Sequence, residues 1–384
     1  MIYISLRTKY KKLKGDNLYT ILMFGTGNLS SIIENLLNDK VNILAYVDND
    51  HNKWNSKKND KYIISPDKIA NYDYDYIIIA SQFNEEIYTQ LLLMNIDKRK
   101  IFQYSKFMDN YWNYCKEYIN VFKSHLDGFF EVLVTGISYA LFGFSEKKCI
   151  KRTLKFAFSS QDLFYDYNII KYLIKNYKYE MSNVKAVIIG LSYYSFQYDM
   201  SLSAMKSKTV MYYEVLKDSH HFKEIQRVYE EYDINKSIGD KLLRKNKDGK
   251  YDIQDMEDEK INVFENMELI GKQQAKRDCN KNYPNTVKEN VEIFEAYLNL
   301  LMDNDIKPIV VVFPATKYYT SHFSERIEQE FKNIIEKVQK KYDFQYIDYF
   351  RSSLFKDDDF KDVSHLNKTG AIKFTQILNK IINW

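Results

Sequence analysis

Ser138, Asp362 and His365 have the side chains that nucleophilic catalysis by a serine requires. A serine hydroxyl is a poor nucleophile at neutral pH, so it needs a histidine to accept its proton and a carboxylate to orient that histidine. Asp362 and His365 stand three positions apart, so one tight loop can present both side chains. The chain contains 6 histidines, which makes a histidine in this setting informative. The Asp-x-x-His spacing alone is also typical of a surface loop before a capped helix.

An α/β architecture would bring these side chains together. Short apolar runs alternate with amphipathic stretches, which is typical of strands separated by helices. The second series has expected strands at Val132–Val134, Leu154–Phe158, Ala186–Ile189, Ile309–Phe313 and Phe344–Ile347, and expected helices at Leu163–Ile174, Val287–Met302, Ile327–Val338 and Ala371–Ile382. In an open α/β sheet, ligands gather beyond the carboxyl ends of the strands. Because Ser138 follows the first of these strands and His365 follows the last, we expect both at one rim.

The first part of the chain predicts a smaller Rossmann-like unit. Its expected strands are Ile21–Phe24, Val41–Val47, Tyr76–Ala80 and Ile101–Phe102, and its expected helices are Leu29–Leu37 and Glu85–Met94. Gly25, Gly27 and Asn28 follow the first strand, where glycines let a phosphate approach a helix N-terminus. Asp48 ends the second strand, where a carboxylate can bind a ribose hydroxyl. Ser30 replaces the third glycine of the fingerprint, so nucleotide or nucleotide-sugar binding, NAD-dependent redox chemistry and a purely structural role stay open.

Two motifs of the larger part resemble those of the SGNH/GDSL hydrolase superfamily. They are Gly136-Ile137-Ser138 near its start and Asp362-Val363-Ser364-His365-Leu366-Asn367-Lys368-Thr369-Gly370 near its end. The resemblance covers about residues 130 to 384 and implies a flavodoxin-like, three-layer α/β/α fold. By matching position, it implies that Ser138 is the nucleophile and that Asp362 and His365 complete a catalytic triad.

The middle motifs depart from the superfamily pattern. Many members carry glycine in the second motif and Gly-x-Asn in the third as oxyanion donors, whereas this chain has Ser159-Ser160-Gln161 and Gly190-Leu191-Ser192. One oxyanion donor stabilises a transition state by roughly 3 kcal/mol, so the missing asparagine needs a substitute. The candidate donors are the Ser138 N–H, Ser160, Gln161 and Ser192. The segment that ends at Asp162 is also typical of a helix N-cap.

The smaller unit resembles Rossmann-like domains of bacterial sugar-modifying enzymes, including the N-terminal domains of sugar O-acyltransferases. The resemblance rests on Gly25-Thr26-Gly27, Tyr46-Val47-Asp48-Asn49-Asp50, Pro66 and Ile77-Ile78-Ile79-Ala80-Ser81. Together, the two resemblances imply a Ser-His-Asp esterase or O-acyltransferase that acts on acylated sugars of surface polysaccharides. Two other classes stay open, a non-catalytic scaffold of the same fold and a nucleotide-sugar-dependent enzyme whose chemistry lies in the N-terminal domain.

A chain of 384 residues is long enough for two domains. We expect a Rossmann-like domain at residues 1–104, a linking helix at 105–128 and an SGNH-like domain at 129–384. Residues 201–283 are dense in Lys, Glu and Asp and are expected to form a charged insertion. Such an insertion is either a solvated helical excursion or a lid over the ligand-binding edge.

Composition excludes several other classes. Lys+Arg 56 against Asp+Glu 52 gives a net charge of +4, too balanced to indicate a nucleic-acid partner. The cysteines, 3 in number, have neither disulfide-framework nor zinc spacing, which fits a reducing, cytoplasmic compartment. No apolar run reaches the ~18 residues of a membrane span. The basic segment Met1–Leu13 is not followed by the apolar region of a signal peptide.

The serine chemistry requires no cofactor, and the sequence predicts no metal site. His220 and His221 are adjacent, so a helix would not place both imidazoles on one face, and no carboxylates of convincing spacing accompany them. The expected partner is a carbohydrate or sugar-ester substrate. The acyl group, the acceptor and the oligomeric state stay open.

Overall fold

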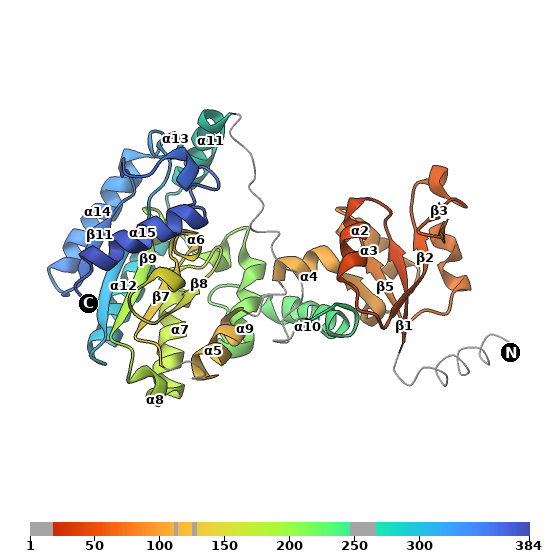
Figure 1. Ribbon diagram of the computed structural model, residues 1–384, viewed down its shortest axis with the longest axis horizontal. Coiled ribbons are helices and arrows are strands. Elements are labelled where there is room, and N and C mark those ends of the chain that lie inside the picture. The colour runs from red at the N-terminus through yellow and green to blue at the C-terminus, as the bar shows by residue number, and fades with distance from the viewer. Residues whose placement is uncertain (1–17, 111–113, 125–128, 246–265) are drawn as a thin grey trace. The chain divides into compact units, whose positions relative to one another are not determined.

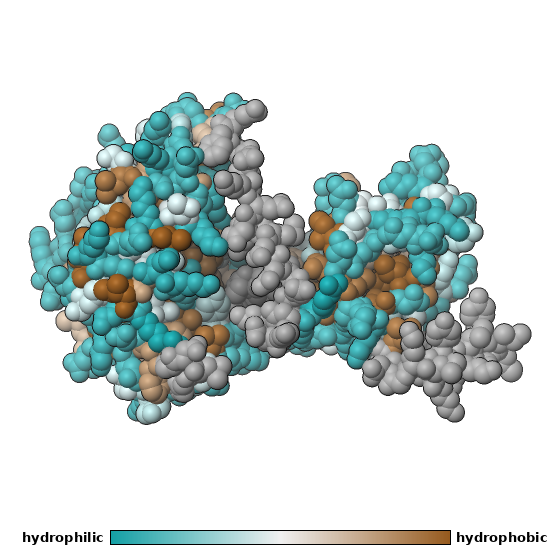
Figure 2. Space-filling view, in the orientation of Figure 1, coloured by the Kyte–Doolittle hydropathy of each residue, from teal (hydrophilic) through white to brown (hydrophobic). Residues whose placement is uncertain are grey.

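The computed structural model describes residues 18–110, 114–124, 129–245 and 266–384. The chain forms two compact units, one from Met1–Trp112 and Gln226–Glu259 (unit 1) and one from Asn113–Ile225 and Lys260–Trp384 (unit 2). Two segments discussed above lie outside the described residues, namely Met1–Leu13 and residues 246–265 of the expected insertion. Figure 2 shows that hydrophilic side chains cover most of the visible surface of both units.

Unit 1 contains a sheet of the Rossmann type (Figure 1). Its strands are β1 (Tyr19–Phe24), β2 (Val41–Val47), β3 (Lys57–Lys58), β4 (Lys61–Ile64), β5 (Tyr76–Ile79) and β6 (Ile101–Gln103), in the order β3-β4-β2-β1-β5-β6. All pairings are parallel except the pairing of β3 with β4. The parallel strands follow the first five positions of the Rossmann strand order 3-2-1-4-5-6. Helices α2 (Asn28–Leu36) and α3 (Asn84–Leu93) follow β1 and β5. The expected Rossmann-like sheet is confirmed, with an additional short β3–β4 hairpin.

Helix α10 (Ile225–Leu242) completes the core of unit 1, although it lies far along the chain. Its residues Ile238 and Leu242 are buried in the same cluster as Phe102 of β6. The Asn235 side-chain oxygen accepts a hydrogen bond of 2.8 Å from the buried N–H of Gln103. The assignment of residues 201–283 to an insertion of the second domain is therefore wrong for α10. Its apolar stripe covers the first sheet, which corrects the domain boundary.

Unit 2 contains a second sheet, and all of its strands are parallel. The strands are β7 (Val132–Gly136), β8 (Thr153–Ala157), β9 (Ala186–Leu191), β10 (Lys307–Val312) and β11 (Gln345–Asp348), in the order β11-β10-β9-β7-β8. Read from the other edge, this is the flavodoxin-like order 2-1-3-4-5, whose switch point lies between β7 and β9. The α/β class is confirmed, and a ligand site is expected at the carboxyl ends of β7 and β9.

Helices cover both faces of the second sheet (Figure 1). Helices α6 (Ser138–Gly143) and α15 (Lys368–Ile381) contact each other on one face, and α7 (Leu163–Asn176) and α12 (Pro284–Met302) contact each other on the other. The remaining helices of unit 2 are α5 (Tyr114–Ser124), α8 (Lys178–Met181), α9 (Val210–Leu216), α11 (Met267–Cys279), α13 (Lys317–Thr320) and α14 (Glu325–Gln339). Val132, Leu133 and Val134 of β7 are almost fully buried. Continuous apolar runs are typical of parallel strands covered on both faces.

The expected linking helix at 105–128 corresponds to two helices in different units. Helix α4 (Tyr104–Asn110) belongs to unit 1, whereas α5 belongs to unit 2 and contacts β8 and α9. Residues 111–113 and 125–128 lie outside the described residues. Within the described ranges, no helix is long and apolar enough to cross a membrane.

Candidate functional site

Ser138 lies at the switch point of the second sheet, directly after β7. It is the first residue of α6, and Ile137 precedes it in an extended conformation. Gly136 makes this sharp strand-to-helix turn possible with a φ of 135°, which side-chain-bearing residues rarely adopt. A Cβ atom on Gly136 would lie 2.4 Å from the carbonyl oxygen of Gly190 in β9. The chain therefore needs glycine at this position to present Ser138 at the rim.

The loop before α15 brings His365 and Asp362 to the same rim. The Ser138 Oγ lies 2.8 Å from His365 Nε2. On the other side of the ring, His365 Nδ1 lies 2.9 Å from one carboxylate oxygen of Asp362 and 3.0 Å from the other. Both ring nitrogens are thus hydrogen-bonded in the serine–histidine–carboxylate order. The structure brings the three residues together as the sequence analysis expected.

The Asp362 carboxylate is held by its own loop. Its Oδ1 accepts hydrogen bonds of 2.9 Å from the backbone N–H groups of Ser364 and His365. Burial raises the pKa of Asp362, but the hydrogen bond and charge of His365 and the two backbone N–H groups outweigh it and lower the pKa from 3.8 to about 2. Asp362 is therefore ionised at neutral pH and holds a proton on His365 Nδ1. This tautomer leaves the Nε2 lone pair facing the Ser138 hydroxyl.

Ser364 is a further contact of this pair that the motif alone did not single out. Its side chain is fully buried, and its Oγ lies 3.2 Å from both Asp362 Oδ1 and His365 Nδ1. Gln274 of α11 donates a 2.8 Å hydrogen bond to the same hydroxyl. Helix α11, which lies within the expected charged insertion, therefore reaches the loop that carries Asp362 and His365.

Aromatic rings flank the imidazole. The ring centroids of Tyr139 and Phe142 lie 5.0 Å and 5.5 Å from that of His365. Lys361 places its ammonium over Phe142, 3.0 Å from the ring centroid. Tyr139 is buried, and its hydroxyl faces that of Tyr319. The histidine thus has one polar edge toward Asp362 and apolar ring contacts on α6, which restrict its rotation.

Two of the expected oxyanion donors, Ser138 and Ser160, follow the neighbouring strands β7 and β8. The N–H of Ser138 begins α6 and so has no acceptor within the helix. Ser160 lies in the turn after β8, which adjoins the end of β7 because the Phe158 N–H donates to the Gly136 carbonyl. Ser160 has a φ of 68°, the conformation that glycine adopts most easily. Its backbone therefore turns as a glycine would, although Ser160 carries a side chain.

Gln161 does not serve as an oxyanion donor, which corrects the expectation. Its buried side-chain nitrogen donates to the Phe156 carbonyl at 2.7 Å and to Asp166 at 2.5 Å, so both amide hydrogens are used. Its side-chain oxygen accepts from Tyr212. The backbone N–H of Gln161 donates to the Phe158 carbonyl. The side chain of Gln161 thus stabilises the turn after β8 and is buried in unit 2.

Ser192 and Asp162 also have local partners. The Ser192 N–H donates to Ser195 Oγ at 2.9 Å, and the two hydroxyls lie 3.2 Å apart. Only the hydroxyl of Ser192 is therefore left to act as a donor. Asp162 is the N-cap of α7, since its side chain accepts from the Tyr165 N–H, as the alternative interpretation expected.

The nucleotide-binding candidates of unit 1 lie together at the end of β1. Gly25 has a φ of 114°, and a Cβ atom there would lie 2.4 Å from the Ala80 carbonyl oxygen. The close approach to β5 thus explains this glycine without a ligand. Gly27 and Asn28 are exposed at the start of α2.

Asp48 is bound by its own neighbours. Its carboxylate accepts hydrogen bonds from the Thr26 hydroxyl, from Lys53 at 3.0 Å and from the Asp50 N–H at 2.9 Å. Burial raises its pKa, and these hydrogen bonds lower it more, so the carboxyl is ionised. These three contacts give Asp48 a sufficient structural role without a ligand.

A second polar cluster in unit 2 joins two carboxylates to the histidine pair that was set aside above. Asp199, His220, His221 and Glu289 bring ligand-capable atoms within 4.8 Å of one another. The two histidines do not lie on a helix, because His220 has a φ of 54° in a turn. The turn lets adjacent rings point the same way. The His-His pair was the available signal, whereas Asp199 and Glu289 are too distant in the sequence to be recognised as its partners.

Similarity to known proteins is partial. Residues 17–102 match a family model described as C2185-like, N-terminal, which covers less than half of the chain. The comparison with curated proteins found no match. A solved structure from Streptococcus pneumonia, provisionally described as a platelet activating factor, is similar at 10% identity and a TM-score of 0.37, with 77% of this chain and 98% of that chain covered. The chemistry of unit 2 is therefore inferred from its own side chains.

Proposed function

We propose that unit 2 is a Ser-His-Asp esterase or O-acyltransferase. The observation that carries this proposal is the continuous hydrogen-bonded series from Ser138 Oγ through both nitrogens of His365 to Asp362, with distances of 2.8 Å and 2.9 Å. A serine at a strand-end turn, a histidine at hydrogen-bonding distance and an ionised orienting carboxylate together meet the requirements for nucleophilic catalysis.

The proposed first step accounts for each proton and bond. Ser138 Oγ attacks the carbonyl carbon of an ester while its proton passes to His365 Nε2. The tetrahedral intermediate then breaks its bond to the alcohol oxygen, and His365 returns the proton to that oxygen. Asp362 stays ionised and balances the charge of the imidazolium. The product is an acyl group on Ser138 and a free alcohol.

The second step decides between the two reaction classes. Water attack on the acyl-enzyme gives hydrolysis, whereas attack by a sugar hydroxyl gives transfer, and in both His365 removes the proton of the attacking group. The Ser138 N–H and the Ser160 turn are the proposed oxyanion donors. A site that lacks one side-chain donor loses roughly 10²–10³ in rate, so a modest catalytic rate is expected.

The substrate class is proposed from the resemblance stated above. We propose an acylated sugar of a surface polysaccharide as substrate, handled in the cytoplasm. Unit 1 then serves as a second ligand-binding or docking module. The position of Gly27 and Asn28 at the exposed start of α2 supports a phosphate-bearing ligand there.

A fluorophosphonate probe tests the proposal on the full chain. We expect covalent labelling of the wild-type protein, none of Ser138→Ala, and normal labelling of Ser321→Ala, whose serine is exposed. Equal labelling of wild type and Ser138→Ala would reject Ser138 as the nucleophile. Absence of labelling in the wild type would favour the non-catalytic scaffold.

Product analysis separates hydrolysis from transfer. The substrate is a chromogenic acetyl ester, and a sugar acceptor is added. If the protein is a transferase, the chromophore should still be released, but the second product should be acetylated sugar instead of acetate. Release of acetate alone, at any acceptor concentration, would restrict the proposal to an esterase.

A further inference from the structure

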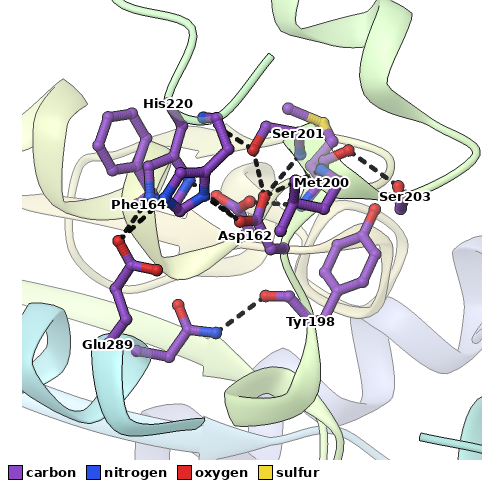
Figure 3. A network of polar contacts seen from close by, with 12 residues as sticks. Asp162, Phe164, Tyr198, Met200, Ser201, Ser203, His220 and Glu289 are labelled. Carbon is purple, nitrogen blue, oxygen red and sulfur yellow. Dashed lines mark hydrogen bonds and ion pairs between the residues drawn. The ribbon is translucent and has the colours of Figure 1, made fainter. Parts of the chain in front are cut away.

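The cluster of Asp199, His220, His221 and Glu289 connects the segment between β9 and α10 to helix α12 of unit 2. Asp199, His220 and His221 lie on the chain between β9 and α10, whereas Glu289 projects from α12 toward the histidine rings (Figure 3). The residue after Glu289 is Asn290, whose buried side chain donates to the carbonyls of Phe196 and Tyr198 at 3.0 Å. The cluster therefore lies where hydrogen bonds already hold the segment between β9 and α10 against α12.

The two imidazole rings are held side by side. Their centroids are 4.0 Å apart with an interplanar angle of 33°. Phe164 stacks on His220 at 4.0 Å and 10°. The side chains of Asp199 and His220 are only 3% and 8% exposed, whereas those of His221 and Glu289 are 41% and 39% exposed. One side of the cluster is thus rigid and buried, and the other is open to solvent.

Each ring points one nitrogen at each carboxylate. Asp199 Oδ2 lies 2.7 Å from His221 Nδ1 and 3.5 Å from His220 Nδ1. Glu289 Oε1 lies 3.1 Å from His220 Nε2 and 3.5 Å from His221 Nε2. Four ring nitrogens therefore face carboxylate oxygens. An ionised carboxylate can accept hydrogen bonds but cannot donate one.

Two neutral imidazoles supply protons for the two short contacts only, from His221 Nδ1 to Asp199 and from His220 Nε2 to Glu289. In each of the two 3.5 Å contacts, a ring nitrogen without a proton then faces a carboxylate oxygen, acceptor to acceptor. Protonating both rings would place two positive charges in stacked contact, which is repulsive. Among the described residues, the buried His220 Nδ1 has no hydrogen bond of ordinary length, and it faces Asp199 Oδ2 at 3.5 Å. A single cation at one edge of the rings would remove the conflict.

We propose that His220 Nε2, His221 Nε2 and Glu289 Oε1 bind one divalent transition-metal ion, with Zn²⁺ preferred. At Zn–ligand distances near 2.0–2.1 Å, tetrahedral ligand atoms lie about 3.3 Å apart. The separations of 3.1 Å and 3.5 Å between Glu289 and the two Nε2 atoms match that spacing. Two imidazoles and one carboxylate form a donor set suited to Zn²⁺.

Asp199 then has a distinct part in the site. With both Nε2 atoms on the metal, both Nδ1 atoms carry protons, and Asp199 accepts from both. Such a carboxylate orients the rings and increases their basicity. The 3.5 Å contact to His220 Nδ1 shortens in this state, which gives the orphaned nitrogen its partner. Solvent occupies the fourth position through the open side of the cluster.

The metal would link the segment between β9 and α10 to α12. The Met200 N–H, next to Asp199, donates to Asp162 Oδ2 at 2.7 Å, and Asp162 caps α7 directly after the Ser160 turn (Figure 3). A cation at this cluster therefore joins α12 to the segment between β9 and α10, which the Met200–Asp162 hydrogen bond links to the loop after β8. Metal binding should stabilise unit 2 as a whole, because a ligand that binds only the folded state stabilises it.

Zinc titration of the chelator-treated full chain tests the proposal. We expect the wild type to bind one equivalent of Zn²⁺ and its thermal midpoint to rise by several degrees at saturation. His221→Gln and Glu289→Gln alter partly exposed side chains and should fold. Each should weaken Zn²⁺ binding by more than about 100-fold, since even loss of a partner that orients a ligand costs about 10–100-fold.

His322→Gln is the matched control. His322 also contacts a carboxylate, with Nε2 2.6 Å from Glu268 Oε1, but it belongs to no metal-ligand cluster of the described residues. This variant should bind Zn²⁺ as the wild type does. Failure of the wild type to bind a stoichiometric ion, or equal binding by His221→Gln and Glu289→Gln, would overturn the proposal.

The result is independent of the serine chemistry. Zinc affinity is measured without substrate, so it neither requires nor tests labelling of Ser138. Cobalt gives a second readout, because a protein-bound Co²⁺ of low coordination number absorbs visible light more strongly than the aqueous ion. Loss of that absorption in Glu289→Gln but not in His322→Gln would support the site, and its absence in the wild type would reject it.

Discussion

Ser138 Oγ lies 2.8 Å from His365 Nε2, although 227 positions separate the two residues in the chain. The contact exists because both residues stand at carboxyl-end loops of one parallel sheet. Ser138 follows β7 through the turn at Gly136, and His365 lies in the loop before α15, which packs beside α6. The sheet order β9-β7-β8 places the Ser138 turn at the switch point, and the packing of α15 against α6 brings the His365 loop to it.

His365→Gln should remove the proton acceptor of Ser138 while keeping a polar side chain of similar size. We expect the fluorophosphonate labelling rate to fall by at least about 10³-fold. His322→Gln should label at the wild-type rate. Unchanged labelling of His365→Gln would exclude it as the base.

Asp362 should make unit 2 sensitive to acid. The His365 contact and backbone N–H groups lower the pKa of Asp362 from 3.8 to about 2, so the unfolded chain takes up this proton first. The stability that results is fully present above about pH 4 and is lost as the pH falls toward 2. The contribution of Asp362 to the free energy of unfolding is modest, because 40% of its side chain is exposed.

Urea unfolding of Asp362→Asn at several pH values checks this sign. The variant should be less stable than the wild type at pH 6, and the difference should narrow between about pH 4 and 2. Asn in place of the exposed Asp343 should leave the pH dependence unchanged. A difference that widens in acid would contradict the prediction.

Gly136→Ala should destabilise unit 2 by about 2 kcal/mol or more. The added Cβ would require an unfavourable φ and would lie 2.4 Å from the Gly190 carbonyl oxygen, so β7 and β9 would have to separate. Gly27→Ala, with nothing within 4 Å of its Cβ, should change stability by no more than about 0.5 kcal/mol. Denaturant unfolding measures both, and similar losses would show that close strand approach is not the cause.

Leu242→Ala tests the assignment of α10 to unit 1. Leu242 is fully buried in the cluster that contains β1 and β6 residues, so its truncation should cost about 2–5 kcal/mol. Amide exchange of β1 and β5 should accelerate, while fluorophosphonate labelling of unit 2 should persist. Leu93→Ala, at 80% exposure, is the control. Unchanged exchange in β1 would place α10 outside this core.

Local patterns were enough to predict most of both sheets. The strands of unit 2 and four of its helices were predicted to within a few residues, because buried parallel strands are continuous apolar runs and helices carry apolar stripes. The β3–β4 hairpin was missed because its segment begins with Lys57 and Lys58 and has no long apolar run. The stripe of α10 predicted a buried face but could not indicate which core covers it.

The candidate sites divide in the same way. Residue type and position predicted Ser138, Asp362 and His365, since each stands in a strand-end loop and the chemistry needs those three groups. Gln161 had a suitable donor group, yet its neighbours Asp166 and Tyr212 use its amide. Asp199 and Glu289 could not be linked to the histidine pair, because Asp199 stands 22 positions before His221 and Glu289 stands 69 positions after His220. Only the folding of the chain brings them together.

The sequence by itself determined the strands, the helices and the chemical types available at their ends, because hydrophobic periodicity and turn residues act over a few neighbouring positions. Only the tertiary structure decided which polar groups meet and which are already hydrogen-bonded. Those outcomes depend on strand order and helix packing, which join residues hundreds of positions apart and depend on the whole core at once.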